Sequence, residues 1–177
     1  MNNSLINNGA RLVPYSEVHF KKTVEWLNNQ EIREMFGLTN KVNLKTHCEW
    51  INSLNNTKIW AIYDQEINHY CGNILLFSNP SHHSAFIQIY IGEPRSKGKG
   101  IGFSSMNAVL KYGFEKMKIN RIWLKVFSDN ERAISLYEKL GFSLEGYERE
   151  SHFNGRTFKD QLIYSILYRE WKTRKRG

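Results

Sequence analysis

The chain has 177 residues and a mass of 20.9 kDa, a size that suits one globular domain. Hydrophobic residues make up 41% of it and aromatic residues 14%, which excludes a disordered or fibrous protein. The net charge of +8 favours an anionic partner, such as a phosphorylated cofactor, a nucleotide sugar or RNA, without choosing among them. No apolar run approaches the roughly 20 residues that span a bilayer, and the start lacks a signal-peptide pattern, so we expect a cytoplasmic protein without membrane contact.

The first part of the chain predicts helices followed by strands. Residues 1–9 are polar and are expected to form a flexible N-terminal segment, with a first strand at 10–13. Ser16 is placed to cap a helical unit that ends at Gly37, and Thr46 with Glu49 three residues later forms a capping-box pattern for a second helix. Runs rich in β-branched and aromatic residues then predict a three-stranded meander at 58–63, 70–77 and 85–91.

The second part of the chain alternates helices and strands. A helix is expected from Gly100 to about Asn120, with Phe103, Met106 and Leu110 on its apolar face. Strands at 121–127, 142–149 and 158–167 and a short helix at 130–140 complete the pattern. The order β-α-α-β-β-β-α-β-α-β-β predicts a single α/β domain with a mixed sheet over residues 10–168, followed by a solvated basic tail at 169–177.

A glycine-rich loop joins the meander to the next helix. Glycines allow tight turns in which backbone N–H groups face an anion, and the positive end of the helix adds to this attraction. A pyrophosphate therefore suits the loop, although a simple change of chain direction would leave the same pattern. The spacing matches neither a nucleoside triphosphatase loop nor a dinucleotide-binding fingerprint. The loop consists of Arg95, Ser96, Lys97, Gly98, Lys99, Gly100, Ile101 and Gly102.

A second motif spans thirteen residues and contains a cap, a short helix and a stop: Asn130-Glu131-Arg132-Ala133-Ile134-Ser135-Leu136-Tyr137-Glu138-Lys139-Leu140-Gly141-Phe142. Together with the glycine-rich loop it resembles the GNAT superfamily of N-acetyltransferases, whose pattern is [Gln/Arg]-x-x-Gly-x-[Gly/Ala] followed by Asn-x-x-Ala-x-x-Leu-Tyr-x-x-x-Gly-Phe. The resemblance implies acetyl-coenzyme A as the acetyl donor and two central strands that splay apart to admit it. No metal is implied.

The resemblance also assigns roles to residues of both motifs. The strand with Ile89, Tyr90 and Ile91 would pair with the pantetheine arm and offer a backbone N–H to the oxyanion. Tyr137 matches the family tyrosine that returns a proton to the leaving thiolate; a core aromatic residue is the alternative. The loop residues Arg95, Lys97, Gly98, Lys99, Gly100, Ile101 and Gly102 would hold the pyrophosphate, with Asn130, Arg132 and Ala133 on the far side of the coenzyme.

The general base is not assigned by the resemblance. Many relatives carry Glu one residue after the alanine of the third meander strand, but here Ala85 is followed by Phe86. A chain of water molecules is one alternative. The other candidates are titratable side chains near the predicted site: His82, His83, Glu93, Glu148, Glu150, His152 and Asp160.

The acceptor is expected to be a primary amine that attacks the thioester directly. The chain resembles the branch that contains ribosomal-protein N-terminal, spermidine and amino-sugar acetyltransferases, and residues 26–32 resemble helices of nucleotide-linked amino-sugar enzymes. Glu25, Glu31, Glu34 and Glu49 could attract a polyamine, but the net charge of +8 opposes one. We therefore expect a nucleotide-linked amino sugar, with spermidine or a protein N-terminus as alternatives.

Two non-enzymatic alternatives are an acyl-coenzyme A sensor and an RNA-binding module. RNA recognition usually requires an aromatic platform, and no such motif is present, so we expect no nucleic-acid partner. A homodimer is compatible with the sequence.

Overall fold

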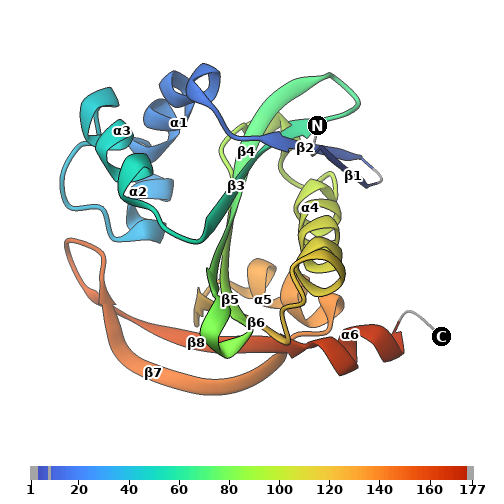
Figure 1. Cartoon of the computed structure of the whole chain (residues 1–177). Helices are drawn as coiled ribbons and strands as arrows, with labels where there is room; N and C mark the ends of the chain where they lie inside the picture. Colours follow the sequence, from blue (N-terminus) through green and yellow to red (C-terminus); the bar gives the residue numbers. More distant parts are fainter. Residues whose placement is uncertain (1–3, 8, 175–177) are drawn as a thin grey trace.

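The computed structural model of the chain describes residues 4–7 and 9–174. A mixed sheet with the strand order β1-β2-β3-β4-β5-β6-β8-β7 forms its middle (Figure 1). All neighbouring strands are antiparallel except β5 and β6, which are parallel. The strands are β1 (Leu5–Asn7), β2 (Ala10–Pro14), β3 (Thr57–Asp64), β4 (His69–Asn79), β5 (Ser84–Ile91), β6 (Arg121–Phe127), β7 (Ser143–Phe153) and β8 (Phe158–Leu167).

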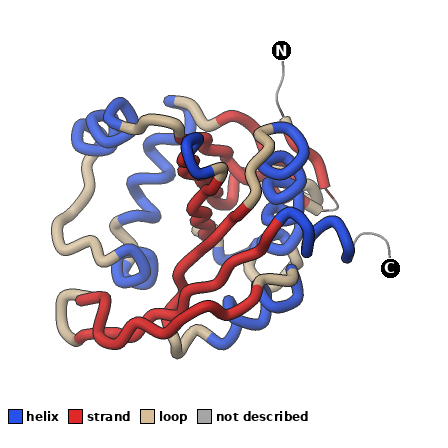
Figure 2. Tube along the Cα trace, turned by 60° about the horizontal axis from the view of Figure 1, so that its bottom comes forward, coloured by secondary structure: helices blue, strands red, loops and turns tan. Residues whose placement is uncertain are grey.

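Helices cover both faces of the sheet. Figures 1 and 2 place α1–α3 on one side and α4 on the other. In the ranges that the structure describes, no helix has the length and apolar character needed to cross a membrane. The α-helices are α1 (Phe20–Leu27), α2 (Gln30–Phe36), α3 (Leu44–Ser53), α4 (Ile101–Lys111), α5 (Glu131–Leu140) and α6 (Tyr168–Arg174).

Capping residues mark the start of α2 and α3 and the end of α2. The helical unit predicted to end at Gly37 consists of two helices, because the side chain of Asn29 caps α2 by accepting a hydrogen bond from the Glu31 N–H. Gly37 ends α2 in the left-handed region at φ 62°. The capping box of α3 is formed by Asn43 and Thr46, so the prediction that Thr46 starts this box was wrong.

The structure differs from the sequence prediction at both ends of the domain. Leu5–Asn7 forms the edge strand β1, which pairs with Ala10–Leu12, and only residues 1–3 and 8 of the expected flexible segment lie outside the described residues. The predicted basic tail begins as helix α6, because Trp171 is buried and packs on Phe114 with ring centroids 5.2 Å apart. One apolar anchor therefore orders this segment.

The main core lies between the sheet and helix α4. Met106 and Leu110 of α4 pack with Leu76, Ile87 and Ile122 of the sheet, and all five side chains are almost fully buried. The predicted apolar face of this helix was wrong at Phe103, which is 40% exposed. Ser104 and Ser105 take part in the buried side instead, so helical periodicity located the helix correctly but shifted its inner face.

The sheet divides into two halves at its centre. Strand β5 pairs with β4 along its whole length, and β6 pairs with β8 along its whole length. The contact between the halves is limited to Ser84, Ala85 and Phe86 of β5 with Arg121, Ile122 and Trp123 of β6. Beyond Phe86 the two strands diverge (Figure 1), which confirms the splayed central strands expected from the family resemblance.

Candidate active site

Three cavities follow one another along strand β5. The loop cavity (about 340 Å³) lies against the 97–102 loop and α5. The central cavity (about 290 Å³) lies between the diverging strands β5 and β6. The helix cavity (about 360 Å³) lies between α1–α3 and strands β3–β5. Met35, Ile89, Asn130, Ala133 and Tyr137 line both the loop and central cavities, whereas Phe36 and Gln88 line both the central and helix cavities.

The glycine-rich loop is held against the sheet by a buried carboxylate. Asp64, at the end of β3, is 1% exposed and accepts a hydrogen bond of 2.9 Å from the Ser96 hydroxyl. Lys99 lies 3.6 Å from the same carboxylate and 2.9 Å from Glu66. Gly98 and Gly100 adopt φ values of 84° and 77°, which L side chains rarely adopt. The space beside Gly100 is open, and the Arg132 side chain lies beside Gly98. The anchor therefore presents a loop whose outer side can receive a ligand.

The residues that are predicted to hold the pyrophosphate do not all line the same cavity. Lys97, Gly98, Gly100 and Gly102 line the loop cavity. Arg95 and Lys99 line a separate surface groove with Lys21 and Lys22, because the turn at Pro94–Ser96 directs Ser96 inward and leaves Arg95 exposed. The Ile101 side chain is 2% exposed and belongs to the core, so only its backbone is available to a ligand.

Helix α5 forms the wall opposite the loop. The Asn130 side chain caps this helix by accepting a hydrogen bond of 3.1 Å from the Ala133 N–H. The Arg132 guanidinium lies 3.8 Å from the position that a Cβ on Gly98 would occupy, so its charge faces the loop. Arg132 and Ala133, which are predicted to lie on the far side of the coenzyme, both line the loop cavity.

Tyr137 lies where the loop and central cavities meet. It is 8% exposed, and burial raises its pKa to about 12, so the phenol stays protonated at neutral pH. Its hydroxyl forms no hydrogen bond with another residue in the described part of the chain. A phenol that is protonated, uncommitted and exposed to both cavities can donate a proton to a bound group.

Strand β5 offers an unpaired backbone edge to the same space. Past Phe86, no described strand pairs with its β6 side, so the peptide groups around Ile89, Tyr90 and Ile91 are available on that side. The Tyr90 side chain points elsewhere: it is 6% exposed, and its hydroxyl accepts a hydrogen bond of 2.6 Å from Asn73. Any contribution of Tyr90 to this edge therefore comes from its backbone.

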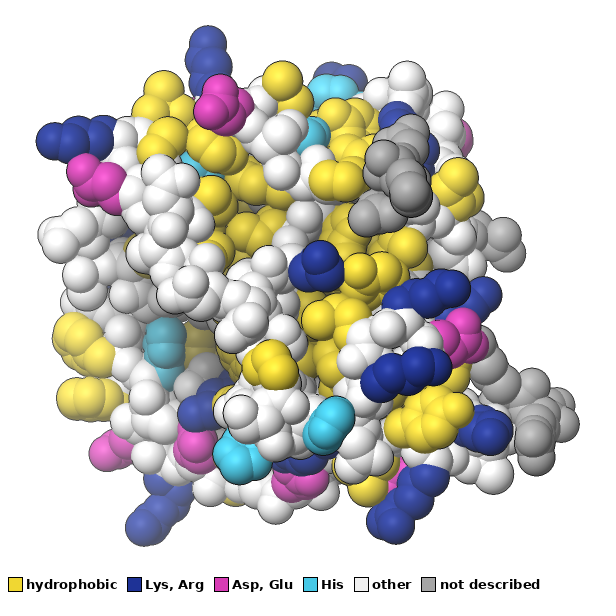
Figure 3. Space-filling model, viewed as in Figure 1, with side chains coloured by type: hydrophobic (Ala, Val, Ile, Leu, Met, Phe, Trp, Pro, Cys, Tyr) yellow, Lys and Arg dark blue, Asp and Glu magenta, His cyan; other side chains and the backbone are white. Residues whose placement is uncertain are grey.

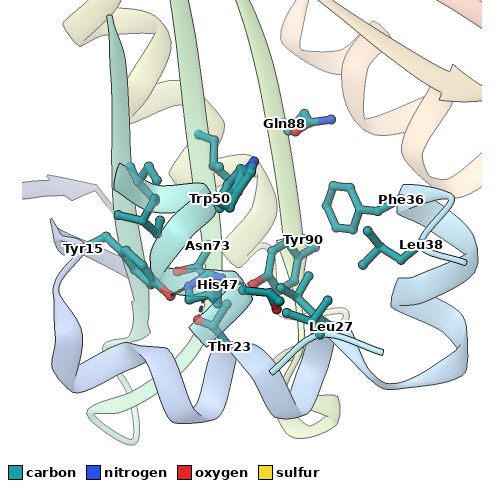
Figure 4. Close-up of a pocket in the computed structure, with 15 residues that line it drawn as sticks. Tyr15, Thr23, Leu27, Phe36, Leu38, His47, Trp50, Asn73, Gln88 and Tyr90 are labelled. Atoms are coloured by element: carbon teal, nitrogen blue, oxygen red, sulfur yellow. Dashed lines mark hydrogen bonds between the residues drawn. The ribbon is translucent and has the colours of Figure 1, made fainter. Parts of the chain in front are cut away.

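The helix cavity is aromatic and uncharged. Figure 4 shows its 15 lining residues, none of which is Asp, Glu, Lys or Arg. The Tyr15 hydroxyl lies 2.8 Å from Nε2 of His47, and burial lowers the pKa of His47. Figure 3 shows hydrophobic side chains gathered in the middle of the molecule in the view of Figure 1. Sequence analysis missed this cavity, because its residues come from helices and strands far apart in the chain and form no local motif.

Comparison with known proteins identifies the family. The acetyltransferase (GNAT) domain family matches residues 10–143. The chain belongs to the GNAT acetyltransferase family. An N-acetyltransferase 9-like protein of Nematostella vectensis is 32% identical over 154 residues, covering 79% of this chain and 77% of the relative. The alpha/beta-tubulin-N-acetyltransferase 9 of Mus musculus is 23% identical over 155 residues, covering 80% of this chain and 64% of the relative.

The fold of a solved acetyltransferase agrees with this assignment. The crystal structure of spermidine N-acetyltransferase from Vibrio cholerae in complex with CoA and spermine has a TM-score of 0.86 and 25% identity, covering 94% of this chain and 99% of that chain. The protein is thus an acetyl-coenzyme A-dependent N-acetyltransferase with the predicted α/β fold, and the prediction of the donor is confirmed.

The loop cavity of this acetyltransferase fits the donor. The open space beside Gly100 would let a pyrophosphate approach the backbone, and Arg132 beside Gly98 and Lys97 would supply positive charge. Lys97 is held by Glu31, with 2.7 Å between Nζ and Oε2. The unpaired edge of β5 leads from this cavity towards the centre, as an extended pantetheine arm requires.

The candidate general bases of this acetyltransferase lie in different parts of the structure. His82 and His83 lie before β5, and Glu93 lies 3.6 Å from His69 outside the three cavities. Glu148 is paired with Lys125 at 2.7 Å, and Asp160 accepts hydrogen bonds from the Tyr147 hydroxyl and the Glu150 N–H. Phe86 packs on Trp123, with ring centroids 4.6 Å apart. Of the candidates, His152 lines the central cavity.

Proposed function

We propose that the three cavities bring the two substrates of acetyl transfer together from opposite ends. The loop and central cavities receive acetyl-coenzyme A, and the helix cavity receives a primary amine. The observation that carries this proposal is that Tyr137 and the unpaired edge of β5 line the same central cavity, which shares Phe36 and Gln88 with the helix cavity. A proton donor, oxyanion donors and both substrate paths then meet at one point.

Acetyl-coenzyme A supplies an acetyl group activated as a thioester. An alkyl amine with a pKa of about 10 is about one part in a thousand neutral at pH 7, so the enzyme must both orient and deprotonate it. Backbone N–H groups of β5 would stabilise the charge that develops on the carbonyl oxygen. The Tyr137 hydroxyl would protonate the departing sulfur.

The lining of the helix cavity argues against two of the expected acceptors. A nucleotide-linked amino sugar needs cations for its phosphates and a polyamine needs carboxylates, but the cavity has neither. Glu25, Glu31 and Glu49 are paired outside it with Lys22, Lys97 and Lys45. None of the comparisons supports the amino sugar.

We infer that the acceptor is a primary amine attached to an apolar group that fills the helix cavity. The α-amine of a protein chain with a large apolar first side chain has this chemistry, because it carries one cation beside an apolar body. The name of the mouse relative, which specifies tubulin N-acetylation, agrees with a protein acceptor. Spermidine is the second candidate because the spermidine N-acetyltransferase of Vibrio cholerae has the same fold and 25% sequence identity to this chain.

Thiol release can be compared among peptides that begin with Met, Leu or Phe, peptides that begin with Ser or Asp, spermidine and a nucleotide-linked amino sugar. We expect the apolar peptides to show kcat/KM values at least about tenfold higher than the other amines, since burial of one apolar group contributes this much discrimination. A preference for spermidine over every peptide would refute the apolar acceptor. Thiol release with none of the amines would restore the sensor alternative.

A further inference from the structure

The β7–β8 hairpin contacts the end of helix α2 through His152. Nε2 of His152 lies 3.3 Å from the carbonyl oxygen of Glu34, and its ring packs against Phe127 with centroids 4.9 Å apart. The ring occupies the space beside Gly37, where an added Cβ would lie 2.5 Å from its Cε1 atom. Helix α2 therefore ends at a glycine, and the imidazole occupies the space that a side chain at this position would need.

An irregularity in β7 directs His152 to this position. The register between β7 and β8 shifts between Glu148 and His152, and Glu150 has a φ of 51°. The Asp160 carboxylate holds this bulge by accepting a hydrogen bond of 2.6 Å from the Glu150 N–H. Bulges commonly re-aim a side chain next to an active site. Here the side chain after the bulge lines the central cavity together with Tyr137.

The contact with Glu34 determines which nitrogen of the neutral imidazole carries the proton. A backbone carbonyl only accepts, so Nε2 must be the donor and Nδ1 is left as a proton acceptor. The amide and ammonium groups that also line the central cavity do not provide a proton acceptor of this kind. Gln88, Asn130 and Gln161 carry amides, which do not take up protons near neutral pH, and Lys125 is bonded to Glu148.

We propose that His152 is the general base of the acetyl transfer, a role that rests on the proposed function. The amine nitrogen forms a bond to the acetyl carbon while the carbon–sulfur bond breaks. Nδ1 of His152 takes the proton that the nitrogen loses, and the Tyr137 hydroxyl gives a proton to sulfur. Solvent then removes the proton from His152 and restores the one on Tyr137, which balances the cycle. His152 thus supplies the base at a site where Phe86 has no proton-accepting group.

Two of the charges around His152 are cations, and each forms an ion pair. Lys159, its partner in the β7–β8 register, lies 2.5 Å from Asp129. Lys125 of β6 is paired with Glu148, and the Glu34 carboxylate accepts a hydrogen bond of 2.9 Å from Gln30. Glu150 and Asp160 belong to the bulge itself. Among these groups five are carboxylates and two are ammonium groups, so negative charge is in excess around the imidazole.

The decisive variant is His152→Gln, because the glutamine amide keeps a donor for the Glu34 carbonyl and removes the base. We expect kcat to fall about 100-fold, with KM for the coenzyme within about twofold of wild type. The decrease in wild-type rate at acid pH, where an imidazole base is protonated, should also be weaker in this variant. His82→Gln, an exposed histidine before β5, is the matched control and should retain wild-type rates.

Two further variants separate chemistry from folding. His152→Ala should recover at least about tenfold in rate when imidazole is added, which a purely structural role would not produce. Gly37→Ala should lose activity although His152 is present, because the new Cβ overlaps the ring. A His152→Gln enzyme with at least half the wild-type kcat, or a His152→Ala enzyme that binds coenzyme but does not respond to imidazole, would overturn the proposal. Inactivity of the wild type would instead refute the proposed function.

Discussion

Tyr137 has two properties that a proton donor needs at the residue scale. Burial raises its pKa to about 12, which keeps the phenol protonated, and its position on α5 brings it to the junction of the loop and central cavities. Its neighbour Phe142 lies 5.9 Å away between ring centroids and supports the ring from the core side. The hydroxyl is the polar part of an otherwise apolar contact, so its removal tests the chemistry with little effect on packing.

We expect Tyr137→Phe to lower kcat at least about 100-fold, the usual range for loss of a general acid. Coenzyme affinity, measured by calorimetry, should stay within about twofold of wild type, because the ring is retained. Thiol release measures the rate. An unchanged turnover would show that Tyr137 is a core aromatic residue and that the sulfur receives its proton from another donor.

At the scale of elements, the first turn of helix α5 contains the helix cap and also lines the loop cavity. Its first turn is capped by Asn130 and faces the loop cavity through Arg132 and Ala133. The cap satisfies an N–H group that would otherwise lack a partner in the helix, and Arg132 lies in the same capped turn. Loss of the cap at this end of the helix would therefore also affect the wall of the loop cavity.

Replacement of Asn130 by Ala should destabilise the protein by about 1 kcal/mol, the typical cost of an N-cap, and lower Tm by about 2–4 °C. Asn130→Ser, which can cap the same N–H group, should recover most of the loss. Thermal unfolding followed by circular dichroism measures both variants. Equal Tm values for wild type, Ala and Ser would contradict the capping role, and a separate loss of coenzyme affinity in both variants would indicate direct contact with the donor.

At the scale of the whole molecule, buried histidines link stability to pH. His19 and His47 are 3% and 2% exposed, and burial lowers the pKa of each below the ordinary value of 6.5. Below about pH 6.5 the unfolded chain therefore binds protons that the folded chain does not. The stability that these groups contribute is present above that pH and is lost as the pH falls through their folded pKa values.

We expect the free energy of unfolding to decrease as the pH is lowered from about 6.5, and His47→Gln to reduce the steepness of this decrease. Urea unfolding at a series of pH values measures it. His83→Gln is the control, because this histidine is exposed. A His47→Gln profile parallel to that of the wild type would show that His47 is not linked to acid unfolding.

Most of the fold follows from local patterns in the sequence. Alternation and β-branched residues located β3–β6 and β8, and helical periodicity located α4 and α5, because short-range backbone preferences determine these elements. The two spaced motifs were sufficient to identify the family and the donor, since their residues lie close together in the chain. Errors occurred where a distant contact decides the structure, as for α6, which depends on Trp171 packing on Phe114.

The acceptor side and the base depend on the tertiary structure. Arg95 and Lys99 have the charge that a pyrophosphate attracts, yet the turn that anchors Ser96 to Asp64 directs them to another groove. The helix cavity joins residues from α1, α3, β4 and β5, and its lack of charge appears only when these elements are packed. His152 is distinguished from the other candidates by a strand bulge and by the end of α2. Sequence alone determined which elements form and which donor is used, because those depend on neighbouring residues; strand divergence and register decided which distant side chains meet.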